Sequence, residues 1–94
     1  MPVRFDVKYE RSKKKIAKKI ALEHIVKTEA LFIEDPTHST LNLKHIVCKR
    51  DKHKRSIRVL GNSGYRILLT TKGETTYFQD IMNHDKYDRL TKDC

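Results

Sequence analysis

The sequence lacks an apolar run of the roughly 20 residues that a bilayer span needs, and its opening decapeptide MPVRFDVKYE has no signal-peptide core. It also has little cysteine: only Cys48, within an expected strand, and Cys94, at the last position. Two cysteines so placed are too few for a disulfide framework and fit a reducing compartment. These absences predict a cytoplasmic protein without structural disulfides.

Motifs for metals and nucleotides are missing as well. The sequence has no Cys-x-x-Cys, no His-Glu-x-x-His and no carboxylate-rich metal loop, so we expect neither a metal nor another cofactor. The glycines of GNSG join two expected strands and lack the helix that follows a phosphate-binding loop. The lysine-rich segment KKKIAKKIALEHIV could lie on a membrane surface, but its position before a strand-rich half favours packing on a sheet.

Positive charge is present in excess. The 94 residues include 21 Lys and Arg against 12 Asp and Glu, a formal net charge of +9. The length suits a single domain, residues 1–94, with one core, and the periodic apolar residues exclude a disordered chain. The charge indicates a polyanion or an acidic protein as partner, with nucleic acid the leading candidate.

The first third of the chain predicts one strand and then helix. Apolar and charged residues alternate in VRFDVKY, residues 3–9, as in a half-buried strand. From Ser12, a candidate N-cap, the sequence favours helix until Asp35 and Pro36 end it. The apolar stripe changes face within this segment, so we expect either a kinked helix or two short helices.

Four strand candidates follow the polar loop DPTHST: TLNLKHIVCK from Thr40, RSIRVLG from Arg55, GYRILLTT from Gly64 and TTYFQDIM from Thr75. Their short polar connections predict an antiparallel meander. A helical layer on one face of that sheet gives a two-layer α+β fold: an N-terminal strand and one or two helices packed on a twisted, mainly antiparallel sheet.

Basic residues concentrate between Lys44 and Arg58, where seven Lys or Arg and two His accompany a single acid, Asp51. A solvated hairpin tip would give the same run. A second basic block, RSKKKIAKK, and the large net charge favour a phosphate-binding surface instead. The residues expected to contact RNA are Lys44, His45, Lys49, Arg50, Lys52, Lys54 and Arg55.

Two short motifs carry a family resemblance. NSGYRILL, residues 62–69, followed by a strand and IMNHDKYDRL, residues 81–90, is similar to the RelE/ParE superfamily of toxins, especially its RelE and HigB branches. The element order is similar over the whole chain, although only SGYRI and HDKYD are specific. The resemblance implies a cognate antitoxin partner. It also implies cleavage of messenger RNA in the ribosomal A site, as in RelE and HigB, whereas ParE toxins share the fold and poison DNA gyrase.

The resemblance also implies site residues. Arg66 in GYRI matches the arginine that RelE-like enzymes place on the scissile phosphate, and Arg58 lies on the preceding strand, where the family also has a basic side chain. Metal-free cleavage further needs a base for the 2′-OH and an acid for the leaving 5′-oxygen. His84 can exchange a proton near neutrality, Tyr87 can stack on a base or reach the ribose, and Asp85 would orient His84 or act itself.

Several alternatives stay open. Typical RelE proteins carry a lysine-rich pair on the strand before SGYR where this chain has only Arg58, so catalytic charge could instead come from Lys44, His45, Lys52 or Lys54. HDKYDRL could simply be a capped helical turn with Tyr87 and Leu90 packed inward. The favoured function is a ribosome-dependent mRNA endonuclease. The alternatives are a ParE-like gyrase poison without enzymatic activity and an inactive basic RNA-binding module.

Overall fold

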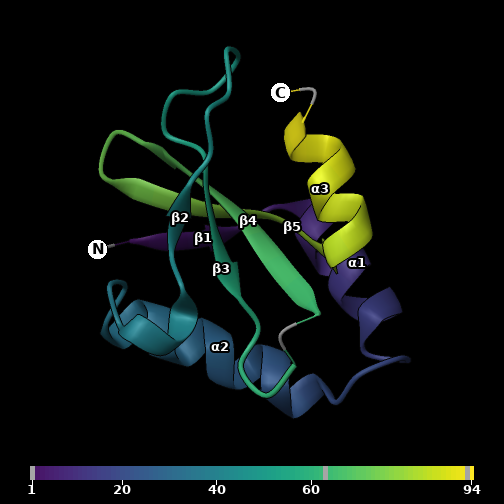
Figure 1. The fold of residues 1–94 in the computed structure, drawn as a ribbon. Coiled ribbons are helices and arrows are strands. Elements are labelled where there is room, and N and C mark those ends of the chain that lie inside the picture. Colours follow the sequence, from purple (N-terminus) through teal and green to yellow (C-terminus); the bar gives the residue numbers. More distant parts are fainter. Residues whose placement is uncertain (1, 63, 93) are drawn as a thin grey trace.

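The computed structural model describes residues 2–62, 64–92 and 94, and in this part of the chain three α-helices and one 3-10 turn pack on a five-stranded sheet (Figure 1). Only β1 and β5 pair in parallel; the other neighbours are antiparallel, in the order β1-β5-β4-β3-β2. This is the predicted α+β class with a mainly antiparallel sheet. The elements are β1 Val3–Phe5, α1 Val7–Ile16, α2 Leu22–Glu34, η1 Ser39–Leu41, β2 Lys44–His45, β3 Arg55–Arg58, β4 Tyr65–Lys72, β5 Thr75–Asn83 and α3 His84–Lys92.

The first strand is shorter than predicted, because helix α1 begins at Val7 and contains Tyr9. The Tyr9 hydroxyl donates to Glu29 Oε2 of α2 at 2.6 Å, and Lys13 Nζ lies 2.9 Å from the same oxygen. Tyr9 and Lys13 are one helical turn apart, so only a helix lets both side chains reach Glu29. Burial, together with the Glu29 carboxylate, raises the pKa of the Tyr9 hydroxyl. The predicted strand over residues 3–9 is therefore correct for Val3–Phe5 and wrong from Val7 onward, where the chain is helical.

Two helices replace the single long one, which is one of the two predicted alternatives. α1 ends at Ile16 and α2 begins at Leu22, while Asp35 closes α2 where the sequence indicated a stop. Ser12 lies inside α1 and the N-cap is Asp6, so the predicted start is wrong. The change of face in the apolar stripe marks the break between the two helices.

Alternation in β3, β4 and β5 builds two cores, one on each face of the sheet. On one face Ile57, Ile67 and Phe78 pack against α1 and α2. On the other, Leu68 and Met82 pack under Tyr87 of α3. α3 thus adds cover on the face opposite α1 and α2 (Figure 1).

The predicted strand from Thr40 is mostly absent. Leu41 is buried in the 3-10 turn η1, and strand β2 contains only Lys44 and His45. Asn42 interrupts the extended backbone with a φ of 48°, in the left-handed region that asparagine tolerates better than most residues. The strands predicted from Arg55, Gly64 and Thr75 are found as β3, β4 and β5, joined as the expected meander.

Cys48 and Cys94 form a disulfide, contrary to the expectation from the sequence. The bond joins the loop after β2 to the end of the chain beyond α3 and lies in the same core as Leu68 and Tyr87. The two cysteines are distant in sequence, so only the packing of α3 on the sheet brings them together. In the described residues, no helix has both the length and the apolar character of a membrane span.

Removing this disulfide is expected to destabilise the fold. The bond closes a loop with a sequence separation of 46. The chain-entropy relation for a loop of that size gives roughly 4 kcal/mol of unfolding free energy. Urea unfolding with and without dithiothreitol measures the difference, and the Cys48→Ser/Cys94→Ser variant, which should not respond to reductant, is the control. Identical midpoints for the oxidised and reduced wild type would show that the bond contributes nothing.

Candidate functional site

Arg66 lies at the centre of the candidate site, on β4 and beneath α3. Its side chain is on the face expected from the alternation of the strand, but it is buried, with only 4% of its surface exposed. Nε and Nη2 donate to Ser56 Oγ at 3.2 and 3.0 Å, and Nη2 also donates to the Asn42 carbonyl at 2.9 Å. Arg66 therefore projects from a sheet face and not from a loop, but this face is covered: the guanidinium is bonded to Ser56 of β3 and to Asn42 after η1, and α3 packs over it.

The ring of Tyr87 covers the Arg66 guanidinium. The ring centroid lies 5.2 Å from the Arg66 guanidinium carbon, a cation–π contact, and the Tyr87 hydroxyl is 2.9 Å from Ser56 Oγ. Burial lowers the pKa of Arg66, and Tyr87 acts in the opposite direction. An arginine ordinarily titrates so far above neutrality that it stays charged here. The cluster Arg66–Ser56–Tyr87 therefore holds one cation away from solvent.

Ser56 was not predicted as a site residue. It is fully buried on β3, directly across from Leu68 of β4, and its hydroxyl bonds both Arg66 and Tyr87. The signal in the sequence is its spacing: Ser56 and Arg58 are two residues apart on one strand, so they share a face. Because Arg58 was predicted to bind phosphate, Ser56 on the same face of the strand could have been predicted as a site residue too.

His84 begins α3 and is exposed, with its ring centroid 5.9 Å from that of Tyr87. Its Nδ1 is 3.4 Å from Asp88 Oδ1, one helical turn further along α3. Asp85, the predicted orienting acid, is the next residue along the helix and is exposed to solvent. Asp88, and not Asp85, is therefore the carboxylate beside the His84 imidazole. Helical spacing of four residues would have identified it.

The segment HDKYDRL also fits its structural alternative in part. It forms the first seven residues of the nine-residue helix α3, and Tyr87 packs inward with 8% of its surface exposed. Leu90, which that alternative also placed inward, is 43% exposed. The Tyr87 ring is thus occupied by Arg66 rather than free to stack on a base in this conformation.

Arg58 faces Arg66 directly across the β3–β4 pair, so the two predicted phosphate ligands lie side by side. Its Nη2 donates to the Thr40 carbonyl at 3.1 Å, and its positive charge is a further influence that lowers the pKa of Arg66. Two guanidinium groups on paired strands could hold a single phosphate, because each can donate two parallel hydrogen bonds.

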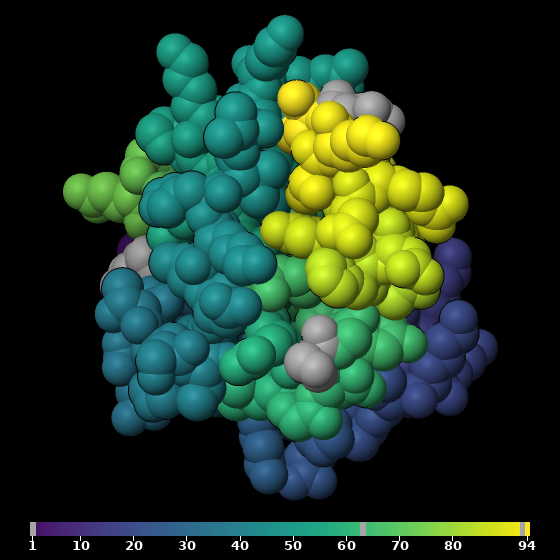
Figure 2. Space-filling model, viewed as in Figure 1, coloured from purple at the N-terminus to yellow at the C-terminus, as the bar shows by residue number. Residues whose placement is uncertain are grey.

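The residues predicted to contact RNA differ in their surroundings. Lys54 Nζ donates to Gln79 at 3.1 Å, whereas its neighbour Arg55 donates to Thr71 Oγ1 at 2.7 Å. His45, Lys52 and Arg55 instead surround a separate hollow of about 230 Å³. Figure 2 shows the segment around residues 45–55 beside the C-terminal helix at the top of the molecule. The remaining predicted contacts, Lys44, Lys49 and Arg50, are exposed.

The site has no group built for metal binding: within residues 2–62, 64–92 and 94, no three His, Cys, Asp or Glu side chains gather closely enough to hold an ion. Its chemistry rests on two arginines, a hydroxyl pair and an imidazole with a carboxylate partner. Such a set can neutralise a phosphate and exchange protons.

Comparisons with known proteins place this geometry in a fold family. No protein-family model matches the sequence, and no curated protein is significantly similar to it. Among solved structures, YafQ from E. coli strain BL21(DE3) superposes with a TM-score of 0.75 at 10% identity, over 90% of this chain and 94% of YafQ. The YoeB/ParE toxin from Agrobacterium tumefaciens gives 0.65 at 11% identity, over 89% of this chain and 99% of that one.

A chain of the RelB–RelE antitoxin–toxin complex from Methanococcus jannaschii is similar as well, with a TM-score of 0.58 at 22% identity, over 92% of this chain and 95% of that one. At these identities the comparison concerns the fold. The chain has the fold of the RelE/ParE superfamily of toxins, as its two short motifs predicted.

Replacing Tyr87 with phenylalanine tests the hydroxyl at this site. The change removes one buried hydrogen bond to Ser56, so the unfolding free energy should fall by about 1 kcal/mol. The family resemblance implies that the hydroxyl reaches the ribose, in which case its loss should nearly abolish the cleavage of messenger RNA that the resemblance also implies. Ser56→Ala breaks the same bond and keeps the tyrosine hydroxyl, but it also removes the acceptor of two Arg66 bonds. Wild-type cleavage by Tyr87→Phe would contradict a direct role of the hydroxyl.

Proposed function

We propose that this protein is the toxin of a toxin–antitoxin pair and acts as a ribosome-dependent mRNA endonuclease that inhibits translation. The observation that carries the proposal is the placement of Arg66 and Arg58 on paired strands, with His84 and Tyr87 presented by α3 at the same site. The family motifs and the toxin fold support the same function.

In the proposed mechanism the two arginines hold the scissile phosphate and stabilise the charge that develops on it. His84 transfers a proton between RNA and solvent, and Asp88, 3.4 Å from its Nδ1, positions the imidazole. The 2′-oxygen of the ribose attacks the phosphorus while its proton passes to the His84 imidazole. The bond between phosphorus and the 5′-oxygen of the next nucleotide then breaks, and that oxygen takes a proton from solvent water. The products are a 2′,3′-cyclic phosphate and a 5′-hydroxyl, without a metal ion in any step.

The state of the site supports the proposed dependence on the ribosome. Arg66 is covered by Tyr87, so a phosphate reaches it only when the tyrosine ring moves aside. His84, by contrast, is exposed to solvent. A ribosome that holds the messenger in line with the 2′-oxygen would supply the positioning that the chain lacks, and such positioning is worth several kcal/mol.

The proposed partners are a cognate antitoxin, the ribosome with its rRNA, and mRNA, in the cytoplasm. A net charge of +9 favours an antitoxin with an acidic segment that folds on the toxin. One similar structure is an antitoxin–toxin complex, which supports this kind of partner. The antitoxin would cover part of the basic surface or displace α3 from Arg66.

The proposal is tested with purified toxin, ribosomes and a defined messenger, in parallel with a supercoiling assay on purified gyrase. Cleavage of ribosome-bound messenger at low protein concentration, with little cleavage of naked RNA, is the expected result. Intact messenger with inhibited or cleavage-trapped gyrase would favour the ParE-like alternative. RNA binding without either activity would favour the inactive RNA-binding module.

A further inference from the structure

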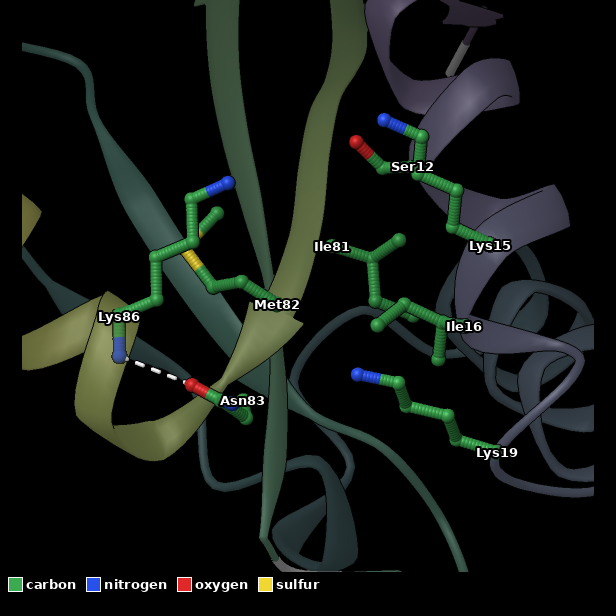
Figure 3. A pocket seen from close by; sticks show the side chains of 8 residues that line it. All are labelled: Ser12, Lys15, Ile16, Lys19, Ile81, Met82, Asn83 and Lys86. Carbon is green, nitrogen blue, oxygen red and sulfur yellow. Dashed lines mark hydrogen bonds between the residues drawn. The ribbon is translucent and has the colours of Figure 1, made fainter.

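A second hollow lies next to the candidate site, between α1, the end of β5 and the start of α3 (Figure 3). Its volume is about 220 Å³. This is below the roughly 300–1,000 Å³ of pockets for drug-sized ligands, so it suits one small charged group rather than a whole metabolite. None of the residues assigned to RNA contact or catalysis lines it.

The rim of this hollow is basic from both sides. Lys15 and Lys19 reach it from α1 and the turn after α1, and Lys86 reaches it from α3 (Figure 3). All three lysines are exposed, and in the described part of the chain none of them pairs with a carboxylate. No carboxylate of the described residues therefore neutralises these three positive charges.

The other polar groups at the rim can donate as well. Ser12 contributes a hydroxyl. Asn83 contributes an amide whose oxygen already accepts the Lys86 backbone N–H at 2.9 Å, drawn as the dashed line in Figure 3. With its oxygen engaged, the Asn83 side chain has its nitrogen left to offer, and that nitrogen is a donor. The hollow thus gathers ammonium, hydroxyl and amide donors around one space, which is the pattern of an anion site.

The floor of the hollow is the open edge of the sheet. β1 pairs with β5 only at Thr76, Tyr77 and Phe78, so the last residues of β5 have β4 on one side and this hollow on the other. The side chains of Ile81 and Met82 close the floor and are almost completely buried. The hollow therefore has an apolar floor and a basic rim.

The hollow is tied to the candidate site through β5. Met82 is the direct partner of Arg66 across the β4–β5 pair, and Asn83 immediately precedes His84. Neighbouring strands lie about 4.8 Å apart, so the hollow begins one strand away from the arginine. A nucleic-acid strand held at Arg66 and passing His84 would meet the three lysines next.

We propose that this hollow binds a backbone phosphate of the RNA strand adjacent to the scissile phosphate and so fixes the direction in which the strand crosses the site. The inference rests on the proposed function, because it takes the strand at Arg66 to be the substrate. An acidic segment of a protein partner would present similar charge. RNA is favoured because two residues that line the hollow adjoin the candidate site, Met82 as the strand partner of Arg66 and Asn83 as the residue before His84, and because the hollow has room for one small anionic group.

The experiment compares two triple variants of equal charge. Lys15→Gln/Lys19→Gln/Lys86→Gln removes the rim, whereas Lys14→Gln/Lys18→Gln/Lys92→Gln removes three exposed lysines of the same segments that do not line the hollow. The probe is a short fluorescent 2′-O-methyl RNA, which binds but cannot be cleaved, followed by anisotropy over a series of salt concentrations. Thermal melting confirms that each variant is folded.

The rim variant is expected to bind RNA about 10-fold more weakly and to lower the salt slope by roughly 0.7, the value for one phosphate on a single strand. The control should change affinity about 2-fold. Equal losses in both variants would overturn the inference, because they would reflect bulk charge. Unchanged RNA affinity in the rim variant with lost binding of poly-glutamate would overturn it too, since the hollow would then serve a protein partner.

This assay is independent of cleavage. If the wild type proves inactive on ribosomes, the RNA affinities still decide whether the hollow binds RNA. If the triple rim variant does not fold, Lys86→Gln alone is compared with Lys92→Gln, and the expected difference is about 3-fold in affinity. No difference between these single variants would reject the site.

Discussion

Replacing Arg66 with alanine is expected to abolish mRNA cleavage, at least 100-fold, and to lower the unfolding free energy by about 2–4 kcal/mol. The first effect follows from loss of the cation proposed to hold the scissile phosphate. The second follows from the position of the side chain: it is 4% exposed and bonded to Ser56 and Asn42. An exposed arginine on a strand would cost less than about 1 kcal/mol.

Because stability and activity both fall, the alanine variant needs a matched partner. Arg66→Lys keeps the charge and loses the forked geometry of the guanidinium. It should remain folded, by urea denaturation, and still lose most of its cleavage of ribosome-bound messenger. Full cleavage by a folded Arg66→Lys or Arg66→Ala variant would show that Arg66 has a structural role under the Tyr87 ring and no role in cleavage.

His84→Ala is expected to separate chemistry from stability. The side chain is exposed, so the unfolding free energy should change by less than about 0.5 kcal/mol. Cleavage should fall by about 100- to 10,000-fold, the usual contribution of a general acid or base. Cleavage rates on ribosome-bound messenger, measured with urea denaturation of the same samples, give both quantities.

Two carboxylate variants sharpen the test of His84. Asp88→Asn, which alters the partner of the imidazole, should reduce cleavage about 10-fold, whereas Asp85→Asn should leave it unchanged. The opposite order would return the orienting role to Asp85. Wild-type cleavage by His84→Ala would remove the histidine from the mechanism.

The sequence predicted the face of Arg66 and not its burial. Alternation along GYRILLTT depends on neighbouring residues, so the side to which Arg66 points could be predicted from the strand alone. Its cover comes from Tyr87, far away in the sequence, and depends on how α3 packs. The same long-range packing brings Cys94 to Cys48, which local patterns could not indicate.

Tyr9 shows a second kind of limit. Its spacing from Phe5 and Val7 fits a strand, and nothing in those residues favours a helix over it. The helix gains the bonds from Tyr9 and Lys13 to Glu29 of α2, so a tertiary interaction decided the local structure. Asn42 ended a predicted strand through a backbone conformation that its residue type permits but does not require.

The most direct test of the central claim is primer extension on messenger from cells that express the wild-type chain, beside cells that express His84→Ala. The account predicts cuts within translated codons in the wild type, with ends bearing a 2′,3′-cyclic phosphate or its 3′-phosphate product, and their near absence in the variant. Intact messenger in cells whose growth is arrested by the wild type would contradict it.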